Sequence, residues 1–478
     1  MGSEMELQQV IYHIFVTQIE FGTYRLGDRL PTIEEAGQLL CVSPDTVRSA
    51  YLRLKKEGYI TLSKHIGAAV AVQFNEQEIS SHILSYFALR KNAMLDLSLS
   101  MKPLFAHIQC VCLKNAGPKL LDQIESITSQ QDCLASYSLI QYMLHIYGSL
   151  KNDLLMRLVW QVFMFFQAPF LSVPQNIKHF KWKDSPLLHT LQLCREQNWP
   201  SLRTSVEAFQ DRLASVLYDF YENNIDSGEP VTQTAFHWNS YKKASQLCYT
   251  LGMEILTDIN RGRYTPGSFL PSLEKMAKEK QVSVSTIRRT LSLLNSIGVT
   301  KSVNGHGTKI LHKNEISENC DLTQPAVRRR LSDYAQSLQI LFLSCREVSK
   351  ITVESLDQEA RLQFIKRLTL LRRLQRYELA VYGILELLTH FAPLQAIRIV
   401  YGELFRQLLW GYPLRSIKED SEESKKICLA SLDHFLECLS RSDWEEFSAK
   451  LEELLQSELA FTAEQLTAMG IRSFHPFI

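Results

Sequence analysis

Apolar residues recur every three or four positions along most of this chain, a spacing that lines one face of an α-helix. The pattern predicts a mainly α-helical protein. Prolines fall between the periodic segments, where helices are expected to end or begin. The clearest helical segments cover residues 138–148, 154–166, 202–222 and 361–388.

The same pattern occurs twice. An offset of 240 residues aligns the two halves without a gap over their first stretches, and the coinciding pairs include Gly27 and Gly267, Pro31 and Pro271, Arg48 and Arg288, and Tyr137 and Tyr377. Later pairs, such as Trp199 with Trp444, require small insertions. The chain is therefore predicted to be a tandem duplication of one unit.

The start of the first unit carries the signals of three helices and a hairpin. A helix over about residues 6–21 is followed by a second helix that Thr32 is placed to cap, and by a third that Ser43 caps, with Pro44 in its first position. Alternation within 58–72 predicts a β-hairpin. Helices two and three form a helix-turn-helix, whose third helix can enter a DNA major groove about 12 Å wide, and the hairpin is the wing.

These patterns predict a mainly α fold class. Two winged helix-turn-helix domains, each with a small β-hairpin wing, alternate with two all-helical bundle domains in an internal tandem duplication. The predicted boundaries are 1–75 and 76–225 for the first winged helix and helical domain, 226–240 for a linker, and 241–313 and 314–478 for the second pair.

Short motifs occur at matching places in both copies. They are Gly27 to Thr32, Val42-Ser43, Thr46 to Arg48 and Glu57 to Ile60 in the first copy, and Pro266-Gly267, Leu270 to Ser272, Val282 to Arg288 and Gly305 to Thr308 in the second. In these residues the sequence resembles the GntR family of bacterial transcription regulators. The resemblance implies that the partner is double-stranded DNA, with the third helix reading bases and the wing contacting the minor groove or the backbone.

The resemblance carries DNA-contact positions over to both copies. They are Ser43, Thr46, Arg48 and His65 in the first copy and Ser283, Thr286, Arg288 and Asn304 in the second. The predicted DNA-binding set is completed by neighbouring residues of the same helix ends and wing, which are Thr32, Asp45, Ser272, Ser285, Arg289 and His306. Hydroxyls and amide groups near helix N-termini suit phosphate oxygens.

Two departures from the family pattern concern base reading. Base-reading members often carry arginine at the positions held here by Glu34 and Glu274, and again at those of Pro44 and Val284. None of these four side chains can make the bidentate contact to guanine that arginine makes. The operator sequence therefore cannot be taken over from the family.

Charge distinguishes the two modules. The whole chain balances 52 Lys and Arg against 51 Asp and Glu, so its net charge gives no argument for a nucleic-acid partner. Residues 241–313, however, hold 12 basic and 4 acidic side chains, whereas residues 1–75 hold 7 and 8. The second module is predicted to bind DNA more tightly and to lose affinity more steeply with salt. The alternative for the first module is a structural or dimerising role.

The helical regions look like the ligand-sensing domains of the family, most like its all-helical FCD branch. Many members of that branch hold a metal with an Asp and three His. The corresponding positions here are occupied by Leu139, Met143, Leu187 and Phe209, and by Leu379, Gly383, Leu432 and Leu454. These residues cannot ligate a metal, so no metal and no cofactor are predicted. Asp433 and His434 lie one position away, which leaves a shifted alignment open in the second unit.

Two further clusters have alternative interpretations. Trp160, Phe163, Phe165 and Phe166 either line an effector pocket or belong to a core. The compact group of His107, Cys110 and Cys112 lacks the second pair of ligands typical of a metal site, which favours buried thiols.

These observations predict a DNA-binding transcription regulator whose single chain forms a pseudo-dimer, reads a two-part operator and responds to a small-molecule effector of unknown identity. It would act as a monomeric pseudo-dimer or a homodimer. The alternative is a ligand-binding or protein-interaction scaffold with degenerate DNA-binding modules.

Other functional classes have less support. The chain shows no phosphate-cradling glycine loop, no nucleophile elbow and no long α/β region like that of the aminotransferase-fused branch of the family, so an enzyme is not predicted. Scattered cysteines, the lack of a long uninterrupted apolar run and the absence of a signal peptide predict a cytoplasmic protein with no membrane partner.

Overall fold

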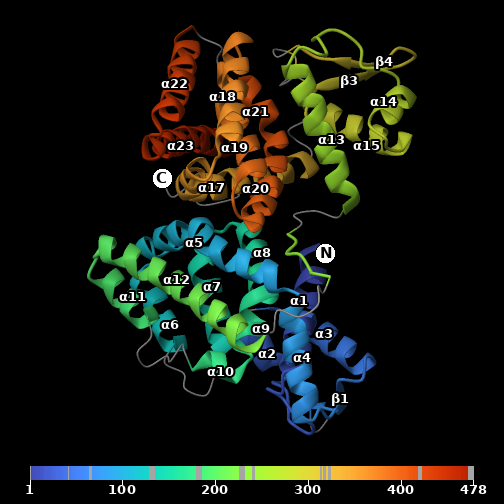
Figure 1. Ribbon diagram of the computed structural model, residues 1–478. Helices are drawn as coiled ribbons and strands as arrows, with labels where there is room; N and C mark the ends of the chain where they lie inside the picture. Colours follow the sequence, from blue (N-terminus) through green and yellow to red (C-terminus); the bar gives the residue numbers. More distant parts are fainter. Residues whose placement is uncertain are drawn as a thin grey trace. The chain divides into compact units, whose positions relative to one another are not determined.

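The computed structural model describes most of the chain, as residues 2–40, 42–63, 67–128, 135–178, 186–225, 232–238, 243–312, 315, 319–320, 325–417 and 422–471. It divides into two compact units. The first consists of Met1–Leu150 and Leu155–Phe236, and the second of Lys151–Leu154 and His237–Ile478. Each unit joins a small winged helix to a larger helical region (Figure 1). The mainly helical fold with two hairpins is confirmed.

The winged helix of the first unit has three helices and one antiparallel hairpin, namely α1 (Gly2–Glu20), α2 (Ile33–Leu39), α3 (Pro44–Lys56), β1 (Ile60–Ser63) and β2 (Gly67–Val70). The hairpin register places Ile60 opposite Val70. A short bridge between Arg29 and Ala69 adds the chain before α2 to the sheet. Phe15 of α1 packs edge-on against Tyr51 of α3, and both rings are buried.

The helical region of the first unit follows directly. Its helices are α4 (Glu76–Ala88), α5 (Lys91–Lys114), α6 (Pro118–Thr128), α7 (Ala135–Gly148), α8 (Asp153–Val162), the π-helical turn η1 (Phe163–Gln167), α9 (Ala168–Leu171), α10 (Pro174–Ile177), α11 (Pro186–Arg195) and α12 (Trp199–Asn224). The long helices α5 and α12 pack along each other. The winged helix is attached through α1, which contacts α4, η1 and α9.

The segment Asp153–Leu171 has the length and composition of a membrane-spanning helix, with a mean hydropathy of 1.5. However, 72% of it is buried inside the unit. That burial is expected of a core helix, so the segment is weak evidence for a membrane span.

The second unit repeats this organisation. Its winged helix consists of α13 (Lys243–Asn260), α14 (Leu273–Glu279), α15 (Val284–Ser296), β3 (Thr300–Val303) and β4 (Gly307–Ile310), with Thr300 opposite Ile310. Its helical region consists of α17 (Pro325–Glu354), α18 (Gln358–Arg373), the 3₁₀ turn η3 (Tyr377–Leu379), α19 (Ala380–Phe391), α20 (Gln395–Gln407), the 3₁₀ turn η4 (Leu408–Gly411), α21 (Tyr412–Ile417), α22 (Glu422–Arg441) and α23 (Trp444–Ala468).

The weakest part of the sequence repeat has a structural counterpart. Trp199 opens α12 and Trp444 opens α23, and each helix is capped by the preceding side chain, Asn198 or Asp443. A cation lies over each indole, Lys114 at 5.7 Å and Arg361 at 5.0 Å from the ring centroid. The tandem duplication is therefore consistent with the structure in the late helices as well.

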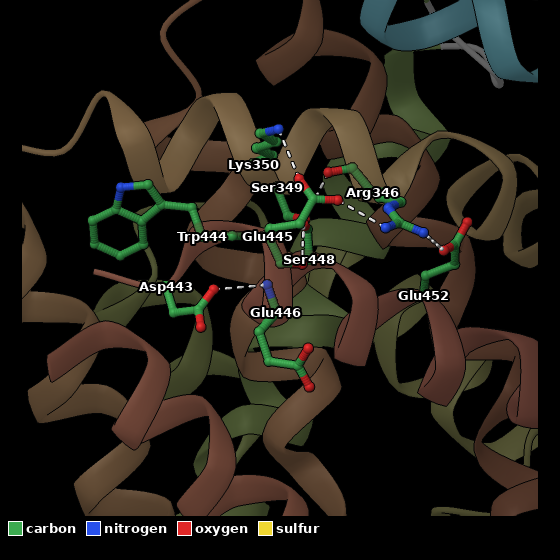
Figure 2. A network of polar contacts seen from close by, with 9 residues as sticks. All are labelled: Arg346, Ser349, Lys350, Asp443, Trp444, Glu445, Glu446, Ser448 and Glu452. Atoms are coloured by element: carbon green, nitrogen blue, oxygen red, sulfur yellow. Dashed lines mark hydrogen bonds and ion pairs between the residues drawn. The ribbon is translucent and has the colours of Figure 1, made fainter. Parts of the chain in front are cut away.

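A network of ion pairs joins α17 to α23 in the second unit (Figure 2). Glu445 accepts hydrogen bonds from Lys350 and from Arg346, each at 2.7 Å, and Arg346 also reaches Glu452 at 3.1 Å. The two cations hold the pKa of Glu445 down at about 2. Because Glu445 is half-exposed, the network contributes only modestly to stability.

One predicted helical segment is interrupted. The run 361–388 contains two helices and a 3₁₀ turn rather than one helix, because α18 ends at Arg373 and α19 begins at Ala380. Gln375 adopts a φ of 54°, which no helix interior tolerates. Apolar periodicity continues across the break, so the pattern alone did not reveal it.

Candidate nucleic-acid interface

The recognition helix of the second unit is α15, and its first turn is held by hydroxyl groups. Ser283 caps the helix by accepting a hydrogen bond from the backbone N–H of Thr286 at 3.1 Å. Its hydroxyl also lies 2.8 Å from the hydroxyls of Ser285 and Thr286. Three hydroxyls thus cluster at a helix N-terminus, where the helix dipole and free amide groups favour a phosphate.

The outer face of α15 carries two arginines. Arg288 and Arg289 are both exposed, and neither forms an ion pair with any residue that the structure describes. The opposite face is anchored by Ile287, Leu291 and Leu294, which are all buried. Packing therefore fixes the helix while its two guanidinium groups stay available for phosphate or base contacts.

The second wing places polar residues at an exposed tip. Asn304, Gly305 and His306 connect β3 to β4, and Gly305 and Gly307 have φ values of 75° and 108°, which favour glycine. The base of the wing is fixed to α15, because Thr300 donates to Asn295 at 2.7 Å and Asn295 donates to Ser302 at 2.8 Å. The wing and the recognition helix are thereby positioned as one surface.

Ser272 belongs to the helix before the recognition helix. It caps α14, accepting a hydrogen bond from the N–H of Lys275 at 3.3 Å, and it is exposed. Thr32 has the same place in the first unit, where it forms a capping box with Glu35. The hydrogen bonds from Thr32 lower the pKa of Glu35. The predicted cap at Thr32 is confirmed.

The first recognition helix, α3, is capped in the same way as α15 but carries an acidic residue beside its arginine. Ser43 caps it, accepting from the N–H of Thr46 at 3.2 Å, with Pro44 in the first helical position as predicted. Thr46, however, is buried, and Arg48 is paired with Asp45 one turn earlier. The structure therefore places an acidic side chain beside the arginine that the sequence assigned to DNA.

His65 at the first wing tip lies outside the described residues, as do its neighbours 64 and 66. The strands beside it pair regularly, with Ser63 opposite Gly67. The recognition helices are therefore described in both copies, whereas the wing tip is described only in the second.

The positions considered for a metal site do not form one. Leu139, Met143 and Leu432 are buried apolar side chains, and the side chain of Leu187, at the start of α11, lies outside the described part of the structure. Among the described residues, no group of three or more His, Cys, Asp or Glu is arranged to hold a metal. His434 instead pairs with Glu446 at 3.1 Å.

The other clusters singled out in the sequence belong to the interior. Cys110 and Cys112 are buried, and burial raises the pKa of their thiols to about 11 and about 12. Phe163 and Phe166 are fully buried within the first helical region. These findings favour the core interpretation of both clusters.

Sequence reasoning missed the pairing between Asp45 and Arg48. The signal was available, because residues three apart on a helix are neighbours and opposite charges at that spacing attract. In the second copy the corresponding pair is Ser285 and Arg288, so the arginine has no acid one turn away.

Comparisons with known proteins agree with this geometry. The family model described as bacterial regulatory proteins, gntR family, matches residues 7–70 and 250–310, which cover both winged helices. A Bacillus subtilis (strain 168) protein named uncharacterized HTH-type transcriptional regulator YhcF is 27% identical over 110 residues, which is 23% of this chain and 89% of that protein.

Solved structures give a weaker likeness. Streptococcus agalactiae GntR is 14% identical, with 45% of this chain and 99% of that chain covered and a TM-score of 0.22. E. coli McbR/YncC is also 14% identical, with 46% and 98% covered and a TM-score of 0.24. Scores this low carry no argument about domain arrangement.

The two family matches fall on the two winged helices, each with a capped recognition helix and a hairpin. This chain therefore carries two DNA-binding domains that match the model of the gntR family of bacterial regulatory proteins.

Proposed function

We propose that this protein regulates transcription by reading a two-part operator in double-stranded DNA with both of its winged helices. The observation that carries the proposal is the pair of capped helices α3 and α15, each with an exposed arginine, Arg48 or Arg288, and each followed by a wing. One chain would then supply two recognition helices and act as a pseudo-dimer, alone or within a homodimer.

The proposed contact set consists of polar residues at helix N-termini, on the recognition helices and at the wing tips. It comprises Thr32, Ser43, Asp45, Thr46, Arg48 and His65 in the first copy, and Ser272, Ser283, Ser285, Thr286, Arg288, Arg289, Asn304 and His306 in the second. Asp45 and Ser285 occupy equivalent positions but differ in charge, so the two half-sites are expected to differ in sequence. The operator is therefore an imperfect repeat rather than a palindrome.

The test is a selection of bound duplexes from a genomic or random library by the purified full-length protein. It is repeated with Arg48→Ala and with Arg288→Ala, and with Arg373→Ala as the control, since Arg373 is exposed on α18 outside both winged helices. The proposal predicts a two-part consensus from which each arginine variant removes one half. Binding that shows no sequence preference, or a consensus unchanged by both variants, would contradict it.

A second function has one observation in its favour. The pairing of Arg48 with Asp45, together with the acidic excess of residues 1–75, fits a first module that serves assembly or a protein partner instead of DNA. That alternative predicts a single half-site in the same selection, lost with Arg288→Ala and indifferent to Arg48→Ala.

A further inference from the structure

A cleft of about 730 Å³ opens inside the second unit, between the winged helix and the helical region. One wall is a face of α13, the other is formed by α19 and α20, and Lys280, the C-cap residue of α14, also lines the cleft. Figure 1 shows α13 standing beside the helical region of the same unit. The charged residues that line the cleft include Glu254, Asp258, Arg261, Lys280, Arg398 and Arg406.

The first copy has no such charges at the corresponding positions of its winged helix. The gapless offset of 240 residues places Thr250, Glu254, Arg261 and Lys280 on Val10, Ile14, Phe21 and Leu40. Those four apolar side chains are buried, at 4%, 3%, 3% and 0% exposure. Phe21, for instance, packs against the rings of Tyr86 and Phe87 of α4. These positions therefore belong to a packed apolar core in the first copy, whereas in the second copy they line a charged cleft.

The acidic side chains of the cleft are already paired. Glu254 binds Lys280 at 3.0 Å, and Asp258 binds Arg263 at 3.4 Å. Glu386 pairs with Arg367 outside the cleft, and Glu403 pairs with Arg406. None of these four acids is therefore left to pair with a further arginine of the cleft.

Two arginines of the cleft are uncommitted. Arg261, on the winged-helix side, has no ion pair with a described residue, and the same is true of Arg398 on α20. The Nε of Arg398 is buried and makes no hydrogen bond in the part of the chain that the structure describes. A buried donor without a partner is costly, and a bound acceptor would satisfy it.

The rest of the lining sets the size and character of a ligand. Met253, Ile399, Phe405 and Trp238 supply apolar surface next to the arginines. The volume lies within the range of about 300–1,000 Å³ that is usual for small-molecule sites. An organic molecule with an apolar or hydroxylated body and an anionic group matches both features, because guanidinium groups bind carboxylates and phosphates in a bidentate manner.

We propose that this cleft binds a small organic anion, a carboxylate or a phosphate ester, between Arg261 of the winged helix and Arg398 of the helical region. Lys280 is the C-cap residue of α14 and lies three positions before Ser283, the N-cap of the recognition helix. An anion bound here contacts both the helix-turn-helix and the helical region of the second unit. Binding therefore changes the mobility of the second winged helix. The regulatory part of this inference rests on the proposed function in DNA binding.

The binding part is tested without DNA, by thermal unfolding of the full-length protein with citrate and, separately, with glucose 6-phosphate. Glucose and sodium chloride at matched ionic strength are the controls. At least one anion is expected to raise the melting temperature by about 2 °C or more at saturation. Citrate alone would identify a carboxylate ligand, and glucose 6-phosphate alone a phosphate ester.

Variants locate the site. Arg398→Gln and Arg261→Gln should each weaken the response at least about tenfold in anion concentration, whereas Arg373→Gln, an exposed arginine on α18, should leave it unchanged. Arg261→Phe restores the residue of the first copy and should also abolish the response. A shift from neither anion, or one that survives both glutamine variants, would overturn the proposal.

The regulatory part is then measured as binding of the selected duplex with and without the active anion. A change of about threefold or more in affinity, absent in Arg398→Gln, supports coupling. An anion-dependent melting shift with unchanged duplex affinity would overturn the coupling and leave the anion site standing. Because the melting shift requires no DNA, failure of the proposed regulator function would be seen separately, in the duplex selection.

Discussion

The two winged helices share one frame and differ in charge. Both recognition helices begin at a serine cap, Ser43 or Ser283, and both wings pair in the same register relative to their helices. In the first, Asp45 forms an ion pair with Arg48. In the second, Ser285 stands in place of the acid, and Arg288 has no ion pair with any residue that the structure describes. The two copies therefore share the residues that fold the module and differ in the charge beside the arginine of the recognition helix.

The largest expected effect is the loss of Arg288. Arg288→Ala removes an exposed guanidinium that has no ion pair among the described residues, so affinity for the selected duplex should fall by about 1–3 kcal/mol. Arg48→Ala should cost less, because Arg48 must first leave Asp45. Fluorescence anisotropy with both variants measures the difference. Equal losses would show that the Asp45 pair has no influence on binding.

Replacing the serine caps should lower stability to a similar extent in the two copies but lower DNA affinity to different extents. Ser283→Ala and Ser43→Ala each remove the acceptor for one helix N–H, at a cost of about 1 kcal/mol in stability. Chemical denaturation should show similar losses for the two variants. DNA affinity should fall more for Ser283→Ala, since Ser283 is exposed beside two further hydroxyls. A much larger stability loss in one copy would mean that the frames are not equivalent.

Exchanging the charge beside the arginine tests the comparison directly. Asp45→Ser should raise DNA affinity on the order of threefold, and Ser285→Asp should lower it by a similar factor, because each changes one negative charge near the phosphates. Both are measured on one duplex over a range of salt concentrations. If Asp45→Ser leaves affinity unchanged at every salt concentration, the first module makes no contact with DNA.

The smallest effect concerns the helical regions. The pKa of Glu445 is about 2, below the ordinary value of 4.5, so the folded protein keeps this carboxylate ionised where the unfolded chain would protonate it. The stabilisation is present above about pH 4.5 and is lost as the pH falls towards 2. Glu445→Gln should lower the melting temperature by only about 1–2 °C at pH 7, because both side chains of the pair are partly exposed.

The control for that variant lies in the first unit, where a single ion pair joins Lys102 of α5 to Asp211 of α12 at 2.9 Å. Asp211→Asn should have a smaller effect at pH 7, since one exposed pair replaces a network. A difference between wild type and Glu445→Gln that stays constant down to pH 2.5 would show that the carboxylate is not the stabilising group.

Local signals explain how much of the fold the sequence revealed. Thr32, Ser43 and Pro44 mark helix starts through their own side chains, so the helix-turn-helix was predictable residue by residue. The break between α18 and α19 was not, because it depends on the backbone of Gln375, which no special residue type announces. The positions proposed for DNA contact came from the family pattern and stay predictions.

The cleft could not be predicted from either copy alone. Arg261 and Lys280 look like ordinary exposed charges on short segments of helix. They line a cleft only because the tertiary fold places residues of α20 opposite them. The offset between the copies contained a partial signal, since buried Phe21 and Leu40 correspond to these two cations.

The most direct test of unequal reading by the two modules is a hydroxyl-radical footprint of the full-length protein on its selected duplex, repeated with Arg48→Ala and Arg288→Ala. We predict two protected patches, with the patch lost in Arg288→Ala protected at lower protein concentration than the patch lost in Arg48→Ala. A single patch that Arg48→Ala leaves intact would contradict DNA reading by the first module, and protection unaffected by either variant would contradict the account as a whole.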